Sequence, residues 1–300
     1  MNNNHSFLGS SVALITPMFD DGEVDYISLE NLIDFHIDAG TSSIVSVGTT
    51  GESATIGVVE HLHVIEHTIK YAANRIPVIA GTGANSTSEA IELTQEAKSL
   101  GADACLLVTP YYNKPTQEGL YQHFKSINDN SSIPLIIYNI PPRSVVDMSV
   151  DTMARLFELK NIIGVKDATG DLDRVDQQKN KMGPDFIQLS GEDGTALEFN
   201  MRGGVGCISV TANIASKLCS EFQEASLSKN NSNLLAKANE INDVLMQLHK
   251  SLFIESSPSP VKFAASLLKL CSEDVRLPLV KVTDETKKTV KSAMTYANLI

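Results

Sequence analysis

Eight short apolar runs recur along the chain, each followed by an amphipathic stretch. They occupy residues 12–15, 44–47, 78–80, 105–108, 135–138, 162–165, 186–189 and 207–210. Continuous β-branched runs without polar alternation are typical of parallel strands that are buried on both faces. Eight of them, roughly 20 to 34 residues apart with a helical stretch between neighbours, predict an α/β fold of the (β/α)8 TIM-barrel type.

The clearest helical stretch spans residues 85–100. Ser86 and Glu89 have the spacing of an N-terminal capping box, and Gly101 is expected to end the helix. A doubly wound sheet is the main alternative, and it usually begins with a glycine-rich first turn. Residues 81–86 supply only two of the three glycines of a dinucleotide fingerprint, so the barrel is favoured.

The barrel is predicted to occupy residues 1–225, as the catalytic domain, and a C-terminal helical domain residues 226–300. Residues 227–256 combine a polar connection with an amphipathic helix. Pro258 and Pro260 indicate a rigid turn, after which two more helices are expected near residues 261–270 and 284–298.

Charge and composition exclude several classes of function. The chain has 24 Lys and Arg against 36 Asp and Glu, a net charge of −12, which argues against non-specific binding to nucleic acid or to an anionic membrane. No apolar run approaches the roughly 20 residues of a spanning helix, and no signal-peptide pattern opens the chain. A cytoplasmic protein is expected, with its four separated cysteines as reduced thiols.

Candidate site residues follow the strands, because the active site of such a barrel forms at the strand ends. Residues 48–53 place two glycines around two threonines, which would let backbone amides and hydroxyls grip a carboxylate. The same pattern is equally typical of a capped strand-to-helix turn. Tyr138 and Arg143 follow the fifth run; each alone suggests packing or surface charge, but together they offer a proton carrier and an anion clamp.

Lys166 is the most informative residue, because it directly follows the apolar sixth run. Burial there disfavours the charged ammonium and leaves a free amine, which can attack a carbonyl to form a Schiff base. An ion pair with Asp167 is the alternative, but neighbours on a strand point to opposite faces. A functional lysine is therefore the better interpretation.

One motif suggests a different chemistry. His63, Glu66 and His67 match H-x-x-E-H, an inverted zinc-protease pattern that would place both histidines on one helical face. The stretch lies midway along a predicted outer helix, away from the strand ends, and no third ligand stands out. Surface histidines are the better account, and no metal site is expected.

Six motifs, in this order, resemble the pyruvate-dependent class I aldolase family of (β/α)8 barrels, which includes N-acetylneuraminate lyase. They are GTTGESAT at 48–55, AGTGANST at 80–87, TPYYNKPTQEGLYQHF at 109–124, YNIPPR at 138–143, GVKDATG at 164–170 and LSGEDG at 189–194. The resemblance runs from residue 9 to about residue 299. It is strongest to members that condense pyruvate with L-aspartate 4-semialdehyde, the first committed step of diaminopimelate and lysine biosynthesis.

The resemblance implies roles for individual residues. Lys166 would form the Schiff base with pyruvate. Thr50 and the nearby backbone would hold the pyruvate carboxylate in a pocket that Gly191 and Ile208 line. The protonated iminium is itself the electron sink, so the family needs no metal or organic cofactor.

A proton relay and an acceptor site are implied in the same way. Tyr138, Thr49 and Tyr112 would form the relay, with Tyr112 reaching in from a neighbouring subunit of a homotetramer built as a dimer of dimers. Judged by itself, the adjacent pair Tyr111 and Tyr112 is more typical of packing or of an interface. Arg143, at the mouth, would bind the carboxylate of the semialdehyde.

Some members of the family are inhibited by L-lysine at a dimer interface, and the resemblance extends to that site. Inhibition is predicted here, chiefly from His61 with Glu89, although Glu89 could equally complete the capping box. Val58 departs from lysine-sensitive relatives, which often have histidine there. The matching positions are Ser53, Ala54, His61, Asn85, Glu89 and Tyr111.

The alternatives within the family are N-acetylneuraminate lyase and the 2-keto-3-deoxy sugar acid aldolases, which keep the lysine and the tyrosine but change the acceptor site. Arg143 and the doubled Thr49–Thr50 favour the condensation with the semialdehyde. A non-catalytic barrel is disfavoured because every site residue is present. Ser257 stands where relatives usually carry asparagine, which affects the site entrance rather than the type of reaction.

Overall fold

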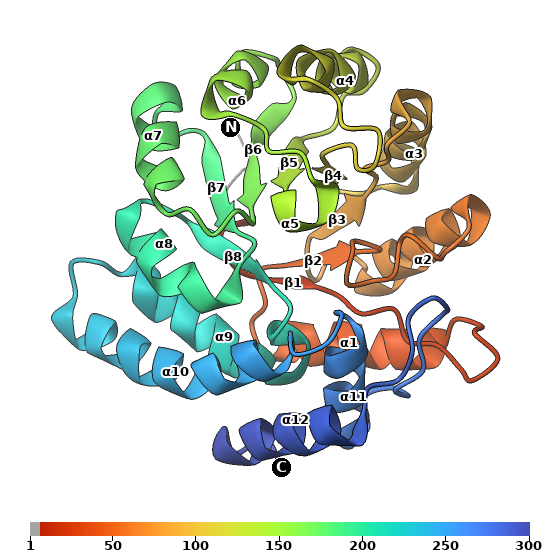
Figure 1. The fold of residues 1–300 in the computed structure, drawn as a ribbon, viewed down its shortest axis with the longest axis vertical. Coiled ribbons are helices and arrows are strands. Elements are labelled where there is room, and N and C mark those ends of the chain that lie inside the picture. The colour runs from red at the N-terminus through yellow and green to blue at the C-terminus, as the bar shows by residue number, and fades with distance from the viewer. Residues whose placement is uncertain (1–6) are drawn as a thin grey trace.

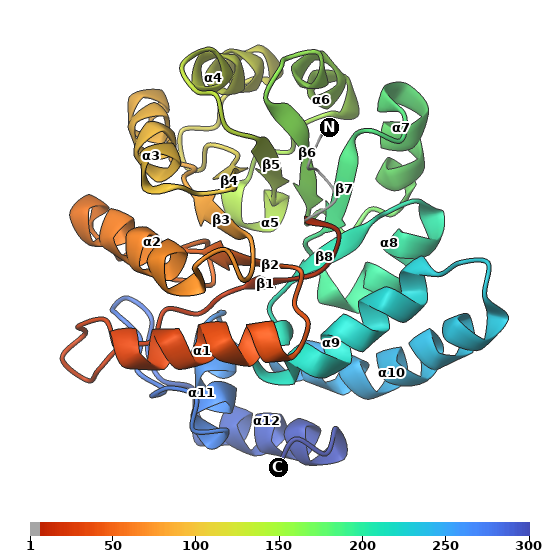
Figure 2. The same cartoon turned by 180° about the vertical axis from the view of Figure 1, so that it is seen from behind.

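A computed structural model describes residues 7–300 (Figures 1 and 2). Its eight parallel strands close into one barrel in chain order, from β1 through β8 and back to β1. Each strand overlaps the apolar run that predicted it, so the predicted barrel is confirmed. The strands are β1 (Gly9–Ala13), β2 (Ser43–Ser46), β3 (Val78–Gly81), β4 (Ala104–Val108), β5 (Leu135–Asn139), β6 (Ile162–Asp167), β7 (Ile187–Ser190) and β8 (Gly206–Ser209).

Helices surround the barrel as an outer ring, and the two views show them on every side of the strands (Figures 1 and 2). Because helices cover one face of each strand and the barrel interior the other, almost every strand residue is buried. The ring consists of α1 (Tyr26–Asp38), α2 (Val58–Ala72), α3 (Thr87–Leu100), α4 (Gln117–Asp129), α6 (Val150–Phe157), α7 (Asp173–Met182), α8 (Ala196–Arg202) and α9 (Ala212–Leu227), with the short α5 (Pro141–Ser144) and η2 (Asp193–Thr195) at strand ends.

Three further helices complete the chain, as predicted. They are α10 (Ser232–Ser251), α11 (Ser259–Leu267) and α12 (Asp284–Tyr296). Figure 1 shows them gathered on one side of the barrel, beside α1 and α9. Helix α10 packs against α9 and α12, and α11 packs against α9 and α12. This side of the barrel mouth is therefore bounded by C-terminal segments.

The predicted capping box at the start of α3 is wrong. Ser86 is the N-cap residue, but its side chain makes no capping bond; its hydroxyl bonds the Ser88 hydroxyl at 3.0 Å instead. Glu89 is thereby free of a capping role, and its side chain points into a cavity. The predicted end of the helix is confirmed, since Gly101 adopts a left-handed φ of +98°.

The cysteines agree with the sequence prediction. All four are free thiols; Cys105, Cys207 and Cys219 are buried and Cys271 is half-buried. Within residues 7–300, no helix combines the length and the apolar character needed to cross a membrane.

Candidate active site

Lys166 lies inside the barrel at the carboxyl end of β6, with 5% of its surface exposed. Its register neighbours are Tyr138 on β5 and Leu189 on β7. The Lys166 Nζ atom lies 4.3 Å from the centroid of the Tyr138 ring. The predicted burial of a lysine at the end of the sixth strand is confirmed, and the structure places it beside a tyrosine on the adjacent strand.

Asp167 points the other way, toward the outer helices. Its Oδ2 atom accepts from Arg174 Nε at 3.2 Å and from Gln178 Nε2 at 3.0 Å, both on α7. Alternation along the strand thus separates the two side chains, as expected. No carboxylate among residues 7–300 forms an ion pair with Lys166.

Space around the lysine is kept open by a glycine. A Cβ atom on Gly191 would lie 3.2 Å from Lys166 Cε and 2.7 Å from Ala168 Cβ, so a larger residue would collide with both side chains. Ile208, on β8, is 1% exposed and belongs to the apolar cluster that fills the barrel together with Tyr138. Both predicted pocket residues therefore lie at the barrel centre.

The loop after β2 carries the two predicted threonines. Glu52 N donates to Thr49 O at 3.1 Å, and Thr16 Oγ1 donates to Gly51 O at 2.8 Å. Thr50 is buried, and Thr49 lies with Tyr138 on the wall of a narrow cavity of about 30 Å³. The loop thus reaches Tyr138 on the fifth strand, whose ring lies beside Lys166.

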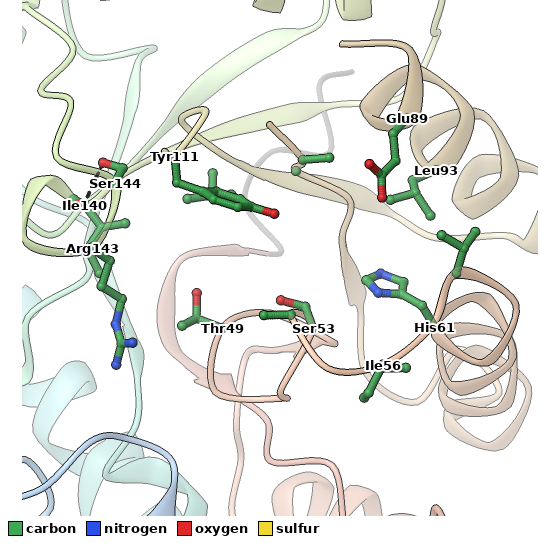
Figure 3. A pocket seen from close by; sticks show the side chains of 15 residues that line it. Thr49, Ser53, Ile56, His61, Glu89, Leu93, Tyr111, Ile140, Arg143 and Ser144 are labelled. Atoms are coloured by element: carbon green, nitrogen blue, oxygen red, sulfur yellow. Dashed lines mark hydrogen bonds between the residues drawn. The ribbon is translucent and has the colours of Figure 1, made fainter. Parts of the chain in front are cut away.

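A larger cavity of about 240 Å³ opens next to this one (Figure 3). Figure 3 shows Thr49 and Ser53 on one wall and Tyr111 opposite them, with His61 and Glu89 at one end and Arg143 at the other. Five of the six residues predicted to bind lysine line it: Ser53, Ala54, His61, Glu89 and Tyr111. The sixth, Asn85, lies beside it and donates through Nδ2 to Tyr111 O at 3.3 Å.

The electrostatics at the His61 end follow from burial. His61 Nε2 donates to Gly81 O at 2.7 Å, which fixes the tautomer and leaves Nδ1 as an acceptor. Burial lowers the pKa of His61, and the Glu89 charge opposes that shift. Burial, helped by Glu89, raises the pKa of Tyr111. This end therefore offers a carboxylate and a neutral imidazole to a ligand.

Arg143 lies on α5 at the mouth. It lines the larger cavity and also a hollow of about 580 Å³ that residues 253–257 complete. Arg143 Nη2 donates to Ser257 O at 3.4 Å. The guanidinium thus faces the opening between the barrel and its C-terminal helices.

Tyr112 is the one predicted catalytic residue that does not lie near the other three within the same chain. Its side chain is 89% exposed, it has a left-handed φ of +73°, and it lines neither cavity that Thr49 lines.

The H-x-x-E-H motif lies on α2, where its side chains have other partners. His67 Nε2 bonds Glu30 Oε1 at 3.0 Å, and Glu66 forms an ion pair with Lys70. Within residues 7–300, no three or more His, Cys, Asp or Glu side chains are placed together to hold a metal ion. The motif is therefore part of the outer helical surface.

Two buried carboxylates of this region were not predicted. Asp193 Oδ2 accepts from the backbone N–H groups of Val210 and Thr211, at 2.9 and 3.2 Å. Glu52 accepts from Lys262 Nζ at 2.7 Å. Nothing in the local sequence pattern pairs Glu52 with Lys262, which lies 210 positions further along the chain. The only available signal was the presence of an acidic residue inside a glycine-rich loop.

A buried strand lysine beside a tyrosine, a glycine that clears space for it and a polar loop at the strand ends define a (β/α)8-barrel enzyme. The model of the Dihydrodipicolinate synthetase family matches residues 6–297, and the chain belongs to that family.

Curated relatives and solved structures agree with this assignment. The 4-hydroxy-tetrahydrodipicolinate synthases of Pelagibacter ubique and Bradyrhizobium diazoefficiens are 64% and 57% identical to the chain, over 98% of its length and 100% and 98% of theirs. A chloride-inhibited dihydrodipicolinate synthase from Acinetobacter baumannii, solved with pyruvate, has a TM-score of 0.95 at 50% identity and covers 98% of this chain and 100% of its own. The synthase from Cyanidioschyzon merolae, solved with lysine bound, has a TM-score of 0.94 at 35% identity, over 98% and 99% of the two chains. The expectation of a synthase-type enzyme is confirmed.

Proposed function

We propose that the chain condenses pyruvate with L-aspartate 4-semialdehyde to 4-hydroxy-tetrahydrodipicolinate through a Schiff base on Lys166. The observation that carries the proposal is the buried Lys166 amine, which has a tyrosine ring rather than a carboxylate beside it. The names of the relatives support the same product, and pyruvate is present in one solved neighbour.

The proposed chemistry balances without a cofactor. The Lys166 amine attacks the keto carbon of pyruvate, water leaves, and a protonated iminium forms. The iminium draws electrons from the methyl group, which loses a proton, and the resulting enamine attacks the aldehyde carbon. The amino group of the semialdehyde then attacks the iminium carbon, which closes the ring and releases Lys166.

Thr50, with the backbone of its loop, is proposed to hold the pyruvate carboxylate, and Gly191 and Ile208 shape the pocket. The support is that Thr50 is buried, that its neighbour Thr49 shares a cavity with Tyr138, and that Gly191 leaves room at Lys166 Cε. Arg143 is proposed to bind the carboxylate of the semialdehyde, because its guanidinium lies at the opening.

Tyr138, Thr49 and Tyr112 are proposed to relay the proton. Thr49 and Tyr138 share one cavity wall, which supports their part. The 89% exposure of Tyr112 fits a side chain that completes the site of a neighbouring subunit. A homotetramer and a cytoplasmic location stay predictions; sedimentation of the wild type and of Tyr112→Phe tests the first.

The decisive experiment combines turnover with trapping. Wild type should oxidise NADPH in an assay coupled to the reductase that consumes the product, only when both substrates are present. Borohydride with pyruvate should add one adduct at Lys166. Lys166→Ala should lose both signals, while Lys217→Ala, an exposed lysine on α9, keeps both. An adduct without semialdehyde-dependent turnover would indicate an aldolase with another acceptor, and a Lys166→Ala enzyme that still turns over would refute the Schiff base.

We also propose that L-lysine inhibits the enzyme from the cavity between His61 and Glu89. A free amino acid has an ammonium group that matches the Glu89 carboxylate, and His61 Nδ1 is available as an acceptor. Lysine is bound in one solved neighbour. Glu89→Gln should raise the half-inhibitory lysine concentration at least tenfold with the uninhibited rate kept; full wild-type activity at millimolar lysine contradicts the proposal.

A further inference from the structure

The loop at residues 48–55 has a backbone that its own sequence does not favour. Val47 and Glu52 have left-handed φ values of +51° and +61°, although neither is glycine and Val47 is β-branched. Such conformations persist only where surrounding contacts hold them, and they cluster at functional sites. Contacts with residues outside the loop must therefore stabilise this backbone conformation.

Glu52 supplies the strongest of these contacts. Its side chain and that of Lys262, on α11, are both 0% exposed, and Lys262 Nζ lies 2.7 Å from Glu52 Oε1. The other carboxylate oxygen, Oε2, accepts from Arg276 N at 3.0 Å. Both oxygens of one loop carboxylate are thus bound by the C-terminal segment, where water cannot compete.

Arg276 attaches the end of the same loop. Its Nη1 atom donates to Thr55 O at 3.3 Å and to Glu60 Oε2 at 2.6 Å, and its Nη2 atom donates to Glu60 Oε1 at 2.7 Å. Thr55 ends the loop and Glu60 lies in the first turn of α2. The C-terminal segment therefore fixes the loop at Glu52, at Thr55 and at the helix that follows.

We infer that the buried Glu52–Lys262 ion pair is a positioning device, through which helix α11 sets the place of Thr49 and Thr50 in the active site. The inference rests on the proposed function, because it takes Thr50 to hold the pyruvate carboxylate. Glu52 and Lys262 touch no reacting atom; they act by holding a strained loop two and three residues away from the groups that bind.

The experiment measures how pyruvate adduct formation at Lys166 depends on pyruvate concentration, with borohydride trapping and mass spectrometry. Glu52→Gln keeps the shape and removes the charge, and Lys262→Met removes the charge from the other side. Each should raise the half-saturating pyruvate concentration at least tenfold. The double variant should be no worse than the poorer single variant, because the two residues act as one unit.

Met294→Ala is the matched control. Met294 lies on α12, is fully buried and takes no part in the hydrogen bonds described above for Glu52 and Lys262. It should lower the melting temperature and leave the half-saturating concentration within twofold of wild type. A rise that follows melting temperature in all the variants would reduce the ion pair to general stability and overturn the inference.

If Glu52→Gln and Lys262→Met do not fold, Arg276→Gln tests the hold of the C-terminal segment on the loop through its other attachment, because the half-buried guanidinium binds Thr55 and Glu60 while the backbone N–H to Glu52 is kept. It should raise the half-saturating concentration about threefold. Unchanged pyruvate dependence in folded variants overturns the inference alone. Failure of wild type to form any adduct overturns the proposed function instead.

Discussion

Lys166 and Lys262 are both buried near the active site, but only Lys262 has a carboxylate partner among the described residues. Lys166, 5% exposed on β6, has the ring of Tyr138 beside its amine and no carboxylate partner among the described residues. Lys262, 0% exposed on α11, lies 2.7 Å from Glu52. A buried charge needs a counter-charge to be tolerated, so Lys262 is structural, whereas an amine without one is left available for chemistry.

The pKa of Lys262 illustrates the balance. Burial lowers it, and the Glu52 carboxylate opposes that shift by charge and by hydrogen bonding. The carboxylate therefore offsets part of the cost of burying the ammonium group at the loop–helix contact. The same substitution, Lys→Met, at each of the two positions tests whether their different partners give them different roles.

The largest effect is expected for Lys166→Met. Turnover should fall by at least about 10⁴-fold, more than 5 kcal/mol of lost transition-state stabilisation, because the Lys166 amine is the group proposed to form the iminium. The unfolding free energy should stay within about 1 kcal/mol of wild type, since an unpaired buried amine is replaced by an apolar chain. Coupled turnover and urea unfolding measure both quantities; a large loss of stability would mean that Lys166 has a structural partner.

Lys262→Met, in contrast, should lower the unfolding free energy strongly. It leaves the Glu52 carboxylate buried without a counter-charge, which typically costs about 3–5 kcal/mol of unfolding free energy. Urea unfolding of Lys262→Met beside Lys166→Met gives the comparison directly. A loss below 1 kcal/mol would show that water or another cation satisfies Glu52.

The cost of burying a charge also predicts how a buried histidine affects stability at low pH. Burial lowers the pKa of His36 to about 3, and its Nε2 atom has no hydrogen-bond partner within residues 7–300. The folded-state pKa lies below that of the unfolded chain, so from about pH 6.5 downward the unfolded chain binds the extra proton and stability falls by about 1.4 kcal/mol per pH unit.

The measurement is the urea unfolding free energy at pH 7 and at pH 5. His36→Gln should lose about 2 kcal/mol less than wild type on this acidification, because the residue that cannot charge in the folded state is gone. His63→Gln, an exposed histidine on α2, should lose as much as wild type. Equal losses in all three proteins would contradict the assignment to His36.

The smallest effect is expected for Arg143→Ala, a cation at the exposed mouth rather than in the interior. It should raise the half-saturating semialdehyde concentration roughly tenfold, about 1.4 kcal/mol, and leave pyruvate adduct formation within twofold. Coupled rates at varied semialdehyde and trapping at varied pyruvate separate the two. Equal losses in both would mean that Arg143 maintains the site through its contact with Ser257.

Local patterns predicted the barrel well because its rules are local. An apolar run long enough for one strand, followed by a helix and a turn residue such as Gly101, indicates each β/α unit, and eight such units in succession are what a (β/α)8 barrel requires. Alternation along β6 also separated Lys166 from Asp167 correctly. The capping box failed because the half-buried Ser86 hydroxyl bonds the hydroxyl of Ser88, two residues on, instead of the backbone of Glu89, three residues on.

The sequence by itself determined the order of the strands, the burial of Lys166 and the set of polar residues at the strand ends, because each depends on periodicity within a few residues. Only the tertiary structure decided that Glu89 faces His61 across a cavity and that Glu52 is bound by Lys262 and Arg276. These contacts join residues far apart in the chain, and their energy depends on the exclusion of water, which exists only once the elements have packed.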